Sequence, residues 1–309
     1  MVYRQSILVT GGAGNVGGAL ARRLTERSDT FVVIVDDLST GSLEKLPPPT
    51  AKNWRFIQAD VNDYDAISAI MISHQFDHVF HYAAVVGVQR TQENPVSVLN
   101  DINGIRNVLE LCKNTGVKKV FYASSSEVYG EPVVIPQHEE TTPLNSRVPY
   151  AVVKNIGEAF LRSYHKQYGL DYTIFRFFNT YGPQQSEDFV VPRFLRQALQ
   201  NEPITIYGKG DQTRTFCYVD DNVDTCLAVL DGAEVPGNVL NIGSADEISV
   251  LELAKLVIQL TDSQSEIVFL PPLEEGDMMR RQPDNSAMLS ILGRDLVPLT
   301  KGLQSMLSS

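Results

Sequence analysis

Short apolar runs alternate with amphipathic stretches through more than the first half of the chain. The apolar runs are rich in β-branched residues, as buried parallel strands are, and comprise Ile7–Thr10, Phe31–Val35, Arg55–Gln58, His78–His81, Val120–Ala123 and Tyr172–Phe177. The amphipathic stretches have helical periodicity and comprise Val16–Glu26, Tyr64–Ser73, Pro95–Lys113 and Tyr150–Tyr168. This alternation predicts an α/β fold with a Rossmann-like, doubly wound parallel sheet and right-handed crossovers.

The pattern becomes less regular after Asn179. Shorter elements follow, separated by Gly208–Gly210, Pro271–Pro272 and Pro283. We therefore expect a sheet domain over residues 1–178, with residues 212–242 returning to it. Residues 179–211 and 243–309 would form a smaller, partly interleaved substrate-binding region that closes over the carboxyl edge of the sheet.

Composition narrows the class of protein. The chain has 26 basic and 37 acidic residues, a net charge of −11, which disfavours nucleic acid as a partner. No apolar run approaches the roughly 18 residues of a membrane span, and the N-terminus has no signal-peptide pattern. The three cysteines have no metal or redox spacing, so we expect no metal site, free thiols and a soluble, cytoplasmic protein.

A glycine-rich turn follows the first predicted strand. Gly11, Gly14 and Gly17 are spaced three apart, and Asn15 and Val16 lie where the first helix begins. In a dinucleotide site the first glycine permits the turn, the second lets the backbone approach a pyrophosphate, and the third lets the helix pack on the strand. The helix amides can then bind phosphate even in an acidic protein.

The next predicted strand ends at Asp36, nineteen residues beyond Gly17. A carboxylate at this place accepts hydrogen bonds from the adenosine ribose. Asp37 adds a second negative charge, and the next basic residue is Lys45, so a 2′-phosphate would be repelled. The sequence therefore predicts NAD rather than NADP. Asp60 follows the third strand and is expected either near the adenine or as a turn residue.

Tyr150 and Lys154 are four residues apart on one predicted helix face. A tyrosine with a pKa near ~10 is a poor base at neutral pH, but a nearby ammonium stabilises the phenolate and lowers that pKa. Ser125 lies in a run of three serines after the fifth strand, where its hydroxyl could hydrogen-bond the same substrate group. These residues predict general base catalysis at the carboxyl edge of the sheet.

These segments together resemble the extended short-chain dehydrogenase/reductase family, in its nucleotide-sugar epimerase, dehydratase and decarboxylase branch. The resemblance covers essentially the whole chain. The matching segments are Thr10–Gly17, Asp36–Gly41, His81–Ala84, Ser124–Gly130, Tyr150–Lys154, Arg176–Pro183, Ile206–Arg214 and Tyr218–Asp221.

The resemblance implies a role for each matched residue. Tyr150 would be the base, Lys154 its partner and ribose anchor, and Ser125 the catalytic hydroxyl. NAD would contact the glycine turn, Asp36, Asp60, Val61, Ala83, Ala84 and Asn100. A nucleotide-sugar, expected to be UDP-linked, would contact Ser125, Ser126, Asn179, Val191, Tyr207, Arg214 and Arg281.

The resemblance leaves the reaction open after the shared oxidation to a 4-keto sugar. His81–Val88 and Val152–Val153 are similar to epimerases, and we expect a UDP-sugar 4-epimerase, an isomerase rather than a lyase. Ser126-Glu127-Val128-Tyr129-Gly130 and Arg280–Asp284 are similar to UDP-glucuronate decarboxylases, which are the alternative together with dehydratases. Ser126 stands where dehydratases have an aspartate. Glu127 is expected to be a second acid/base, a carboxylate that opposes a substrate carboxylate, or a residue that serves the fold or the helix dipole. Arg281 could bind a uronate carboxylate or a phosphate, or be a solvated charge.

Two further expectations concern class and assembly. A protein that only senses NAD or scaffolds partners is the remote alternative, because such proteins typically lose the Tyr–Lys pair or the glycines, and both are intact here. The resemblance also implies a homodimer that pairs two helices across a two-fold axis; the alternative is that both helix faces pack on their own sheet. The partly apolar faces expected to pair consist of Asp101, Ile102, Ile105, Val108, Leu109 and Cys112 on one helix and Ile156, Ala159, Phe160 and Ser163 on the other.

Overall fold

The computed structural model describes residues 3–272 and 280–308. Its centre is a seven-stranded parallel sheet in the order β11-β6-β5-β4-β1-β2-β3. The strands are β1 (Gln5–Thr10), β2 (Thr30–Asp36), β3 (Trp54–Gln58), β4 (His78–His81), β5 (Lys119–Ser125), β6 (Asp171–Phe177) and β11 (Val239–Ile242). The predicted Rossmann-like doubly wound sheet is confirmed.

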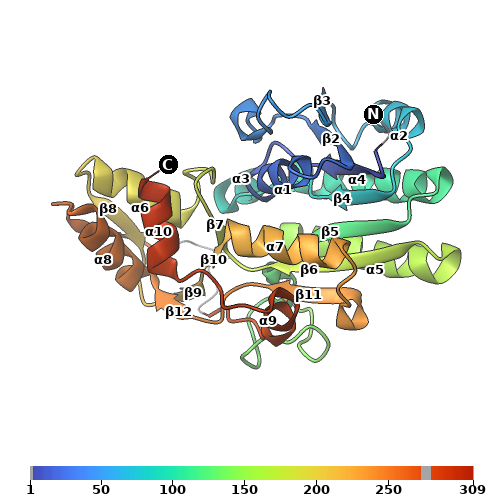
Figure 1. The fold of residues 1–309 in the computed structure, drawn as a ribbon. Helices are drawn as coiled ribbons and strands as arrows, with labels where there is room; N and C mark the ends of the chain where they lie inside the picture. Colours follow the sequence, from blue (N-terminus) through green and yellow to red (C-terminus); the bar gives the residue numbers. More distant parts are fainter. Residues whose placement is uncertain (1–2, 273–279, 309) are drawn as a thin grey trace.

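Helices cover both faces of this sheet (Figure 1). On one face lie α1 (Asn15–Thr25), α7 (Val219–Leu230) and α9 (Ser286–Leu292). On the other lie α2 (Tyr64–Ser73), α4 (Pro95–Thr115) and α5 (Pro149–Tyr168). Each face forms its own apolar core because the strands are apolar on both sides. The strand order reverses at β1, whose neighbours are β2 and β4, and ligands of such sheets bind at the carboxyl ends of strands at this point.

The smaller part of the molecule lies beyond the carboxyl edge of the sheet (Figure 1). It packs α6 (Val190–Leu199), α8 (Val250–Thr261) and α10 (Leu299–Leu307) around a separate apolar core. Its strand pairs are β8 (Ile204–Tyr207) with β13 (Ile267–Leu270), and β9 (Thr213–Thr215) with β12 (Glu247–Ser249). The pair β7 (Thr180–Tyr181) and β10 (Cys217–Tyr218) lies between the two parts.

The chain passes between the two parts more often than its pattern indicates. Helix α7 and strand β11 return to the large sheet, as expected for residues 212–242, but β9 at the start of that range pairs within the smaller part. Helix α9, which falls within 243–309, packs on α7 in the larger part. Short elements absent from the predictions are α3 (Val88–Glu93) and the 3-10 turns η1 (Leu43–Lys45), η2 (Ser126–Tyr129) and η3 (Pro236–Asn238).

The predicted dimer face is wrong for most of its residues on α4. Ile105, Val108, Leu109 and Cys112 on α4 are buried in the core of their own chain, because this side of the helix faces the sheet. Within the described residues, no helix is long and apolar enough to cross a membrane. The cysteines are free and buried, and no group of three or more His, Cys, Asp or Glu residues in the described ranges could hold a metal ion.

Candidate active site

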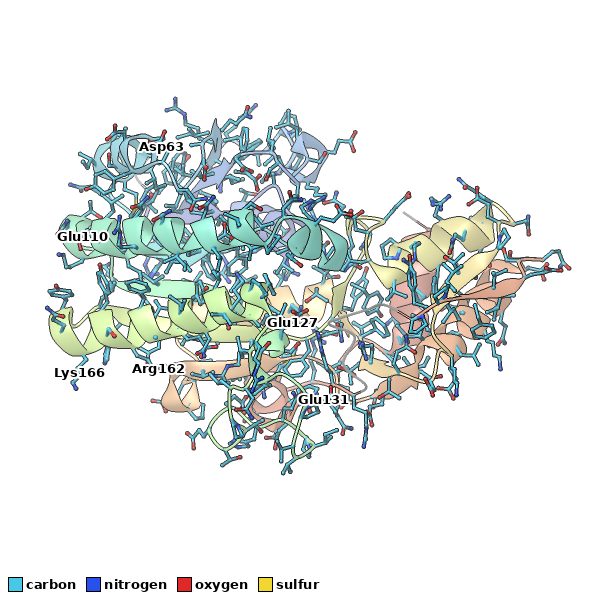
Figure 2. The ribbon with its side chains drawn as sticks, turned by 180° about the vertical axis from the view of Figure 1, so that it is seen from behind. Asp63, Glu110, Glu127, Glu131, Arg162 and Lys166 are labelled. Atoms are coloured by element: carbon cyan, nitrogen blue, oxygen red, sulfur yellow. The ribbon has the colours of Figure 1, made fainter. Side chains whose placement is uncertain are left out.

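A pocket of about 750 Å³ lies at the carboxyl edge of the sheet, where the larger and smaller parts meet. Most of the residues predicted to bind a cofactor or to react line this single pocket. They are Gly11, Gly14, Asn15, Val16, Gly17, Asp36, Asp60, Val61, Ala83, Ala84, Asn100, Ser125, Ser126, Glu127, Tyr150, Lys154, Asn179 and Arg281. Figure 2 shows Glu127 at the end of α5 that faces the smaller part, with Arg162 and Lys166 toward the other end of this helix.

The glycine turn forms one end of the pocket and leaves no room for side chains. Gly11 has a left-handed φ of +68°, and a Cβ there would lie 2.6 Å from the backbone nitrogen of Ala83. A Cβ at Gly17 would overlap the carbonyl oxygen of Gly11. Among the described residues no side chain caps the start of α1, and its first turn has no acidic residue. The turn therefore presents helix amides to the pocket and fits a pyrophosphate.

Asp36 is buried at the end of β2 and fixes the turn from the ribose side. Its carboxylate accepts hydrogen bonds from the backbone nitrogens of Ala13 at 3.0 Å and Leu38 at 2.9 Å. Burial raises its pKa, which these two hydrogen bonds oppose. Lys45 also lines the pocket, and its pKa is lowered by burial although the charge of Asp36 opposes this. The sequence placed Lys45 outside the ribose end, whereas the fold brings it near Asp36.

Two residues that follow β3 reach the pocket in different ways. The Asp60 carboxylate accepts a hydrogen bond from the backbone nitrogen of Asn62 at 2.8 Å, so it closes a turn and lines the pocket as well. Val61 is buried between the pocket and α4, where a Cβ on Gly104 would lie 2.8 Å from its side chain. The turn role of Asp60 is thus present, and contact with the adenine stays a prediction.

Tyr150 and Lys154 lie one turn apart on α5, with the Lys154 Nζ atom 5.7 Å from the centre of the Tyr150 ring. Lys154 is buried, and its Nζ donates a hydrogen bond to the Ala123 carbonyl oxygen at 2.7 Å. Burial lowers the pKa of Lys154 to about 8, which the charge of Asp101 opposes. The end of β5 thus positions the ammonium beside the base.

The pKa of Tyr150 differs from the expectation. Burial in the pocket and the negative charge of Glu127 raise the pKa of Tyr150, against a hydrogen bond from Ser125 and the charge of Arg281. The ammonium of Lys154 bonds to a backbone carbonyl rather than to the phenol oxygen. Tyr150 therefore stays protonated in the protein alone.

The serine run forms the end of β5 and the turn η2. Ser125 is the N-cap of η2, where its hydroxyl accepts a hydrogen bond from the backbone nitrogen of Glu127 at 3.2 Å. Ser124 also lines the pocket, but its hydroxyl donates to the buried Glu158 carboxylate of α5 at 2.7 Å. Ser125 is therefore the serine placed beside Tyr150, as the sequence predicted.

Arg281 enters the pocket from the segment that precedes α9. Its Nη1 lies 3.5 Å from the Glu127 carboxylate, and the arginine side chain is only 8 % exposed. Both residues are close enough to Tyr150 to influence its pKa, in opposite directions. A cation and an anion thus face the reacting tyrosine from two distant parts of the sequence.

Not all of the residues expected to bind the nucleotide-sugar line this pocket. Asn179 lines the pocket, and its amide donates to the Thr215 carbonyl oxygen at 3.0 Å. Val191 is buried in the core of the smaller part, because it lies on the inner face of α6. Tyr207, at the end of β8, and Arg214, in β9, lie outside the lining of the pocket described above. Arg214 Nη1 donates to the Thr213 carbonyl oxygen at 2.7 Å.

Further charged residues of the pocket were not predicted from the sequence. Asp101 on α4 accepts a hydrogen bond from the Val85 backbone nitrogen at 2.8 Å and faces Lys154. Its position directly after Asn100 was the available signal, but it was assigned to the dimer face. Arg90 of α3 lies 3.3 Å from Asp188 and both line the pocket. This pair joins segments that are 98 residues apart, so no local pattern could indicate it.

The fold and this site are those of an NAD-dependent α/β enzyme. The sequence model described as the NAD dependent epimerase/dehydratase family matches residues 7–243. The chain belongs to this family, and its cofactor is NAD. A solved structure of the Thermus thermophilus UDP-glucose 4-epimerase in complex with NAD is 28 % identical, with a TM-score of 0.90 over 98 % of each chain.

Relatives of known activity are nucleotide-sugar enzymes. The UDP-N-acetyl-alpha-D-glucosaminuronate decarboxylase of Bacillus cytotoxicus is 37 % identical over 91 % of this chain and 89 % of its own length. The UDP-glucuronic acid decarboxylase 3 of Arabidopsis thaliana is 34 % identical over 97 % of this chain and 87 % of its own. The UDP-glucose 4-epimerase of Thermotoga maritima, solved with UDP-glucose, is 33 % identical, with a TM-score of 0.91 over 98 % and 97 %. The curated relatives favour the decarboxylase alternative and do not support the preference for an isomerase over a lyase.

Proposed function

We propose that this enzyme removes carbon dioxide from a UDP-hexuronic acid, such as UDP-glucuronate or its 2-acetamido counterpart, through a 4-keto intermediate. The observation that carries the proposal is Arg281, a buried guanidinium 3.5 Å from Glu127 in the same pocket as Tyr150. A neutral hexose offers no group that requires a cation there, whereas a uronate carboxylate does. The decarboxylase relatives support the same assignment.

The residues that line the pocket fit NAD, because each part of the cofactor has residues that could bind it. The amides of the glycine turn would hold the pyrophosphate, Asp36 the adenosine ribose, and Lys154 the nicotinamide ribose. Bound NAD would accept the hydride from C4 of the sugar and return it after carbon dioxide has left. Its positive ring would also oppose the burial and the Glu127 charge that raise the pKa of Tyr150.

Tyr150 then removes the proton of the sugar 4-hydroxyl, and Ser125 orients that hydroxyl. The resulting ketone at C4 is β to the carboxylate on C5, so the C5–carboxylate bond breaks and its electron pair moves to the C4 oxygen. Tyr150 and Ser125 donate hydrogen bonds to this oxygen as its charge develops. A proton from solvent then completes C5. Arg281 holds the carboxylate away from the like charge of Glu127 until the bond breaks.

The decisive experiment is incubation with UDP-glucuronate, UDP-N-acetylglucosaminuronate, UDP-glucose and dTDP-glucose, followed by mass and NMR analysis. We expect loss of carbon dioxide from a hexuronate. A product of unchanged mass with inverted C4 would instead support a 4-epimerase. This is the second candidate function, and the similarity to the Thermotoga maritima enzyme favours it. Loss of water would indicate a dehydratase.

We propose in addition that the enzyme is a homodimer through the outer faces of α4 and α5. The two helices pack on each other, and Val96 and Leu99 on α4 remain exposed, as does Ala159 on α5. Light scattering at micromolar concentration should give twice the monomer mass, and Ala159→Arg should reduce it. A monomer in the wild type contradicts this assembly.

A further inference from the structure

A buried ion pair joins the catalytic helix to the centre of the sheet. Glu158 lies one turn beyond Lys154 on α5, and its carboxylate accepts hydrogen bonds from Arg176 of β6, from Nε at 2.9 Å and from Nη2 at 2.7 Å. Both side chains are almost fully buried, at 0 % and 1 % exposure. The remaining nitrogen of the guanidinium, Nη1, points away from α5 and toward Tyr129 of η2.

In each hydrogen bond that continues from Arg176 through Tyr129 to Asn241, each group can take only one role, as donor or as acceptor. Arg176 Nη1 donates to the Tyr129 hydroxyl oxygen at 2.8 Å, and a guanidinium cannot accept. The Tyr129 hydroxyl must therefore use its own proton, which it donates to Oδ1 of Asn241 on β11 at 2.7 Å. This bond fixes the orientation of the Asn241 amide, so that Nδ2 donates to the carbonyl oxygens of Gln137 at 2.9 Å and Asp284 at 3.3 Å.

The chain of donors ends on the segment that carries Arg281. The backbone nitrogen of Gln137 donates to the Gln282 carbonyl oxygen, and that of Asp284 to the Gln137 carbonyl oxygen, each at 2.8 Å. These bonds form a bridge between Gln137 and Pro283. The residues directly after Arg281 are thus held by this backbone bridge and, through Gln137 and Asp284, by the buried amide of Asn241.

We propose that Tyr129 and Asn241 are positioning residues. They hold Arg281 in the pocket beside α5, where its guanidinium binds the substrate carboxylate. This inference rests on the proposed function, since it assigns Arg281 to that carboxylate. Removing the Tyr129 hydroxyl breaks this chain of donors without changing a charge or a backbone group. Its loss leaves Asn241 Oδ1 without its donor and frees the amide to turn.

The test is Tyr129→Phe, compared with Tyr181→Phe as a matched control. Tyr181 is equally buried, belongs to the smaller part, and its hydroxyl makes a weak hydrogen bond of 3.4 Å to the Leu299 carbonyl oxygen. Calorimetry on the NAD-loaded enzymes, each of which also carries Tyr150→Phe to prevent turnover, measures the affinity for UDP-glucuronate and for UDP-glucose, which lacks the carboxylate. In Tyr129→Phe we expect affinity for UDP-glucuronate to fall about tenfold, with UDP-glucose and NAD unchanged. Tyr181→Phe should change none of these.

Equal losses for both sugar nucleotides, or no loss, overturn the inference, because a merely structural hydroxyl would not distinguish the two ligands. If circular dichroism shows that Tyr129→Phe does not fold, Asn241→Leu is the second variant. It interrupts the same series of hydrogen bonds one step later and should give the same selective loss of affinity for UDP-glucuronate. The binding measurement needs no turnover. A wild-type enzyme that releases no carbon dioxide therefore overturns the proposed function. The positioning role of Tyr129 and Asn241 is decided separately, by whether Tyr129→Phe loses affinity for UDP-glucuronate but not for UDP-glucose.

Discussion

The guanidinium of Arg281 and the carboxylate of Glu127 lie 3.5 Å apart although 154 residues separate them in the chain. The carboxylate approaches Tyr150 and raises its pKa, and the guanidinium opposes that effect. A substrate carboxylate that binds Arg281 would compete with Glu127 for the same cation. Substrate binding and the charge beside the base are therefore coupled through this pair.

Arg281→Gln should selectively weaken recognition of a hexuronate. A hydrogen bond to a charged group contributes about 1.5–3 kcal/mol, so KM for UDP-glucuronate should rise on the order of tenfold to a hundredfold. The affinity for UDP-glucose should stay close to that of wild type. Arg280→Gln is the control, because Arg280 is exposed and pairs with Glu247 at 2.8 Å outside the pocket. Equal effects of the two variants would contradict the role of Arg281.

Tyr150→Phe should abolish turnover and leave sugar-nucleotide binding nearly intact. Loss of a general base typically costs about 10²–10⁴-fold in rate, while the ring that packs in the pocket is retained. Single-turnover absorbance of NADH reports the oxidation step directly. Tyr168→Phe, at the exposed end of the same helix, should behave as wild type. A rate for Tyr150→Phe within a few-fold of wild type would refute the mechanism.

Asp36→Ala should weaken the binding of NAD more than the binding of NADP, so the preference of the enzyme for NAD should become smaller. The substitution removes a ribose acceptor together with the hydrogen bond that holds Ala13, and it frees Lys45 to meet a 2′-phosphate. Calorimetry on stripped protein should give a loss of NAD affinity of about tenfold. Asp65→Ala, at an exposed position of α2 outside the lining of the pocket, is the control. Equal binding of both cofactors by the wild type would overturn the role of Asp36.

The parts of the site that sequence predicted are those encoded locally. The glycine turn directly follows an apolar strand, and Tyr150 and Lys154 share a helix face, so spacing alone brings their atoms together. The position of Val191 could not be read in this way, because an amphipathic helix such as α6 does not reveal what its apolar face packs on. The pair Glu127–Arg281 depends on the return of the chain through β11 and the bridge at Gln137, which no periodicity indicates.

Lys154 should make the stability of the cofactor-free protein depend on pH. Burial lowers its pKa to about 8 from an ordinary value of 10.5, so the folded state binds this proton less tightly than the unfolded chain does. Below pH 8 both states are protonated, and the buried ammonium destabilises the fold by about 3 kcal/mol, since each pKa unit corresponds to about 1.4 kcal/mol. Between pH 8 and 10.5 only the unfolded chain holds the proton, so this penalty is relieved as the pH rises.

Lys154→Met removes the ammonium and therefore the penalty. Urea unfolding at pH 6 to 10 should show the largest advantage of Lys154→Met over wild type at low pH, with the difference shrinking above pH 8. Part of the advantage is offset at every pH, because the variant also loses the hydrogen bond to Ala123, so the slope rather than the absolute value is decisive. Lys166→Met, on the same helix but exposed, controls for the loss of a lysine as such. Parallel pH profiles for Lys154→Met and wild type would mean that Lys154 is not desolvated in the folded protein.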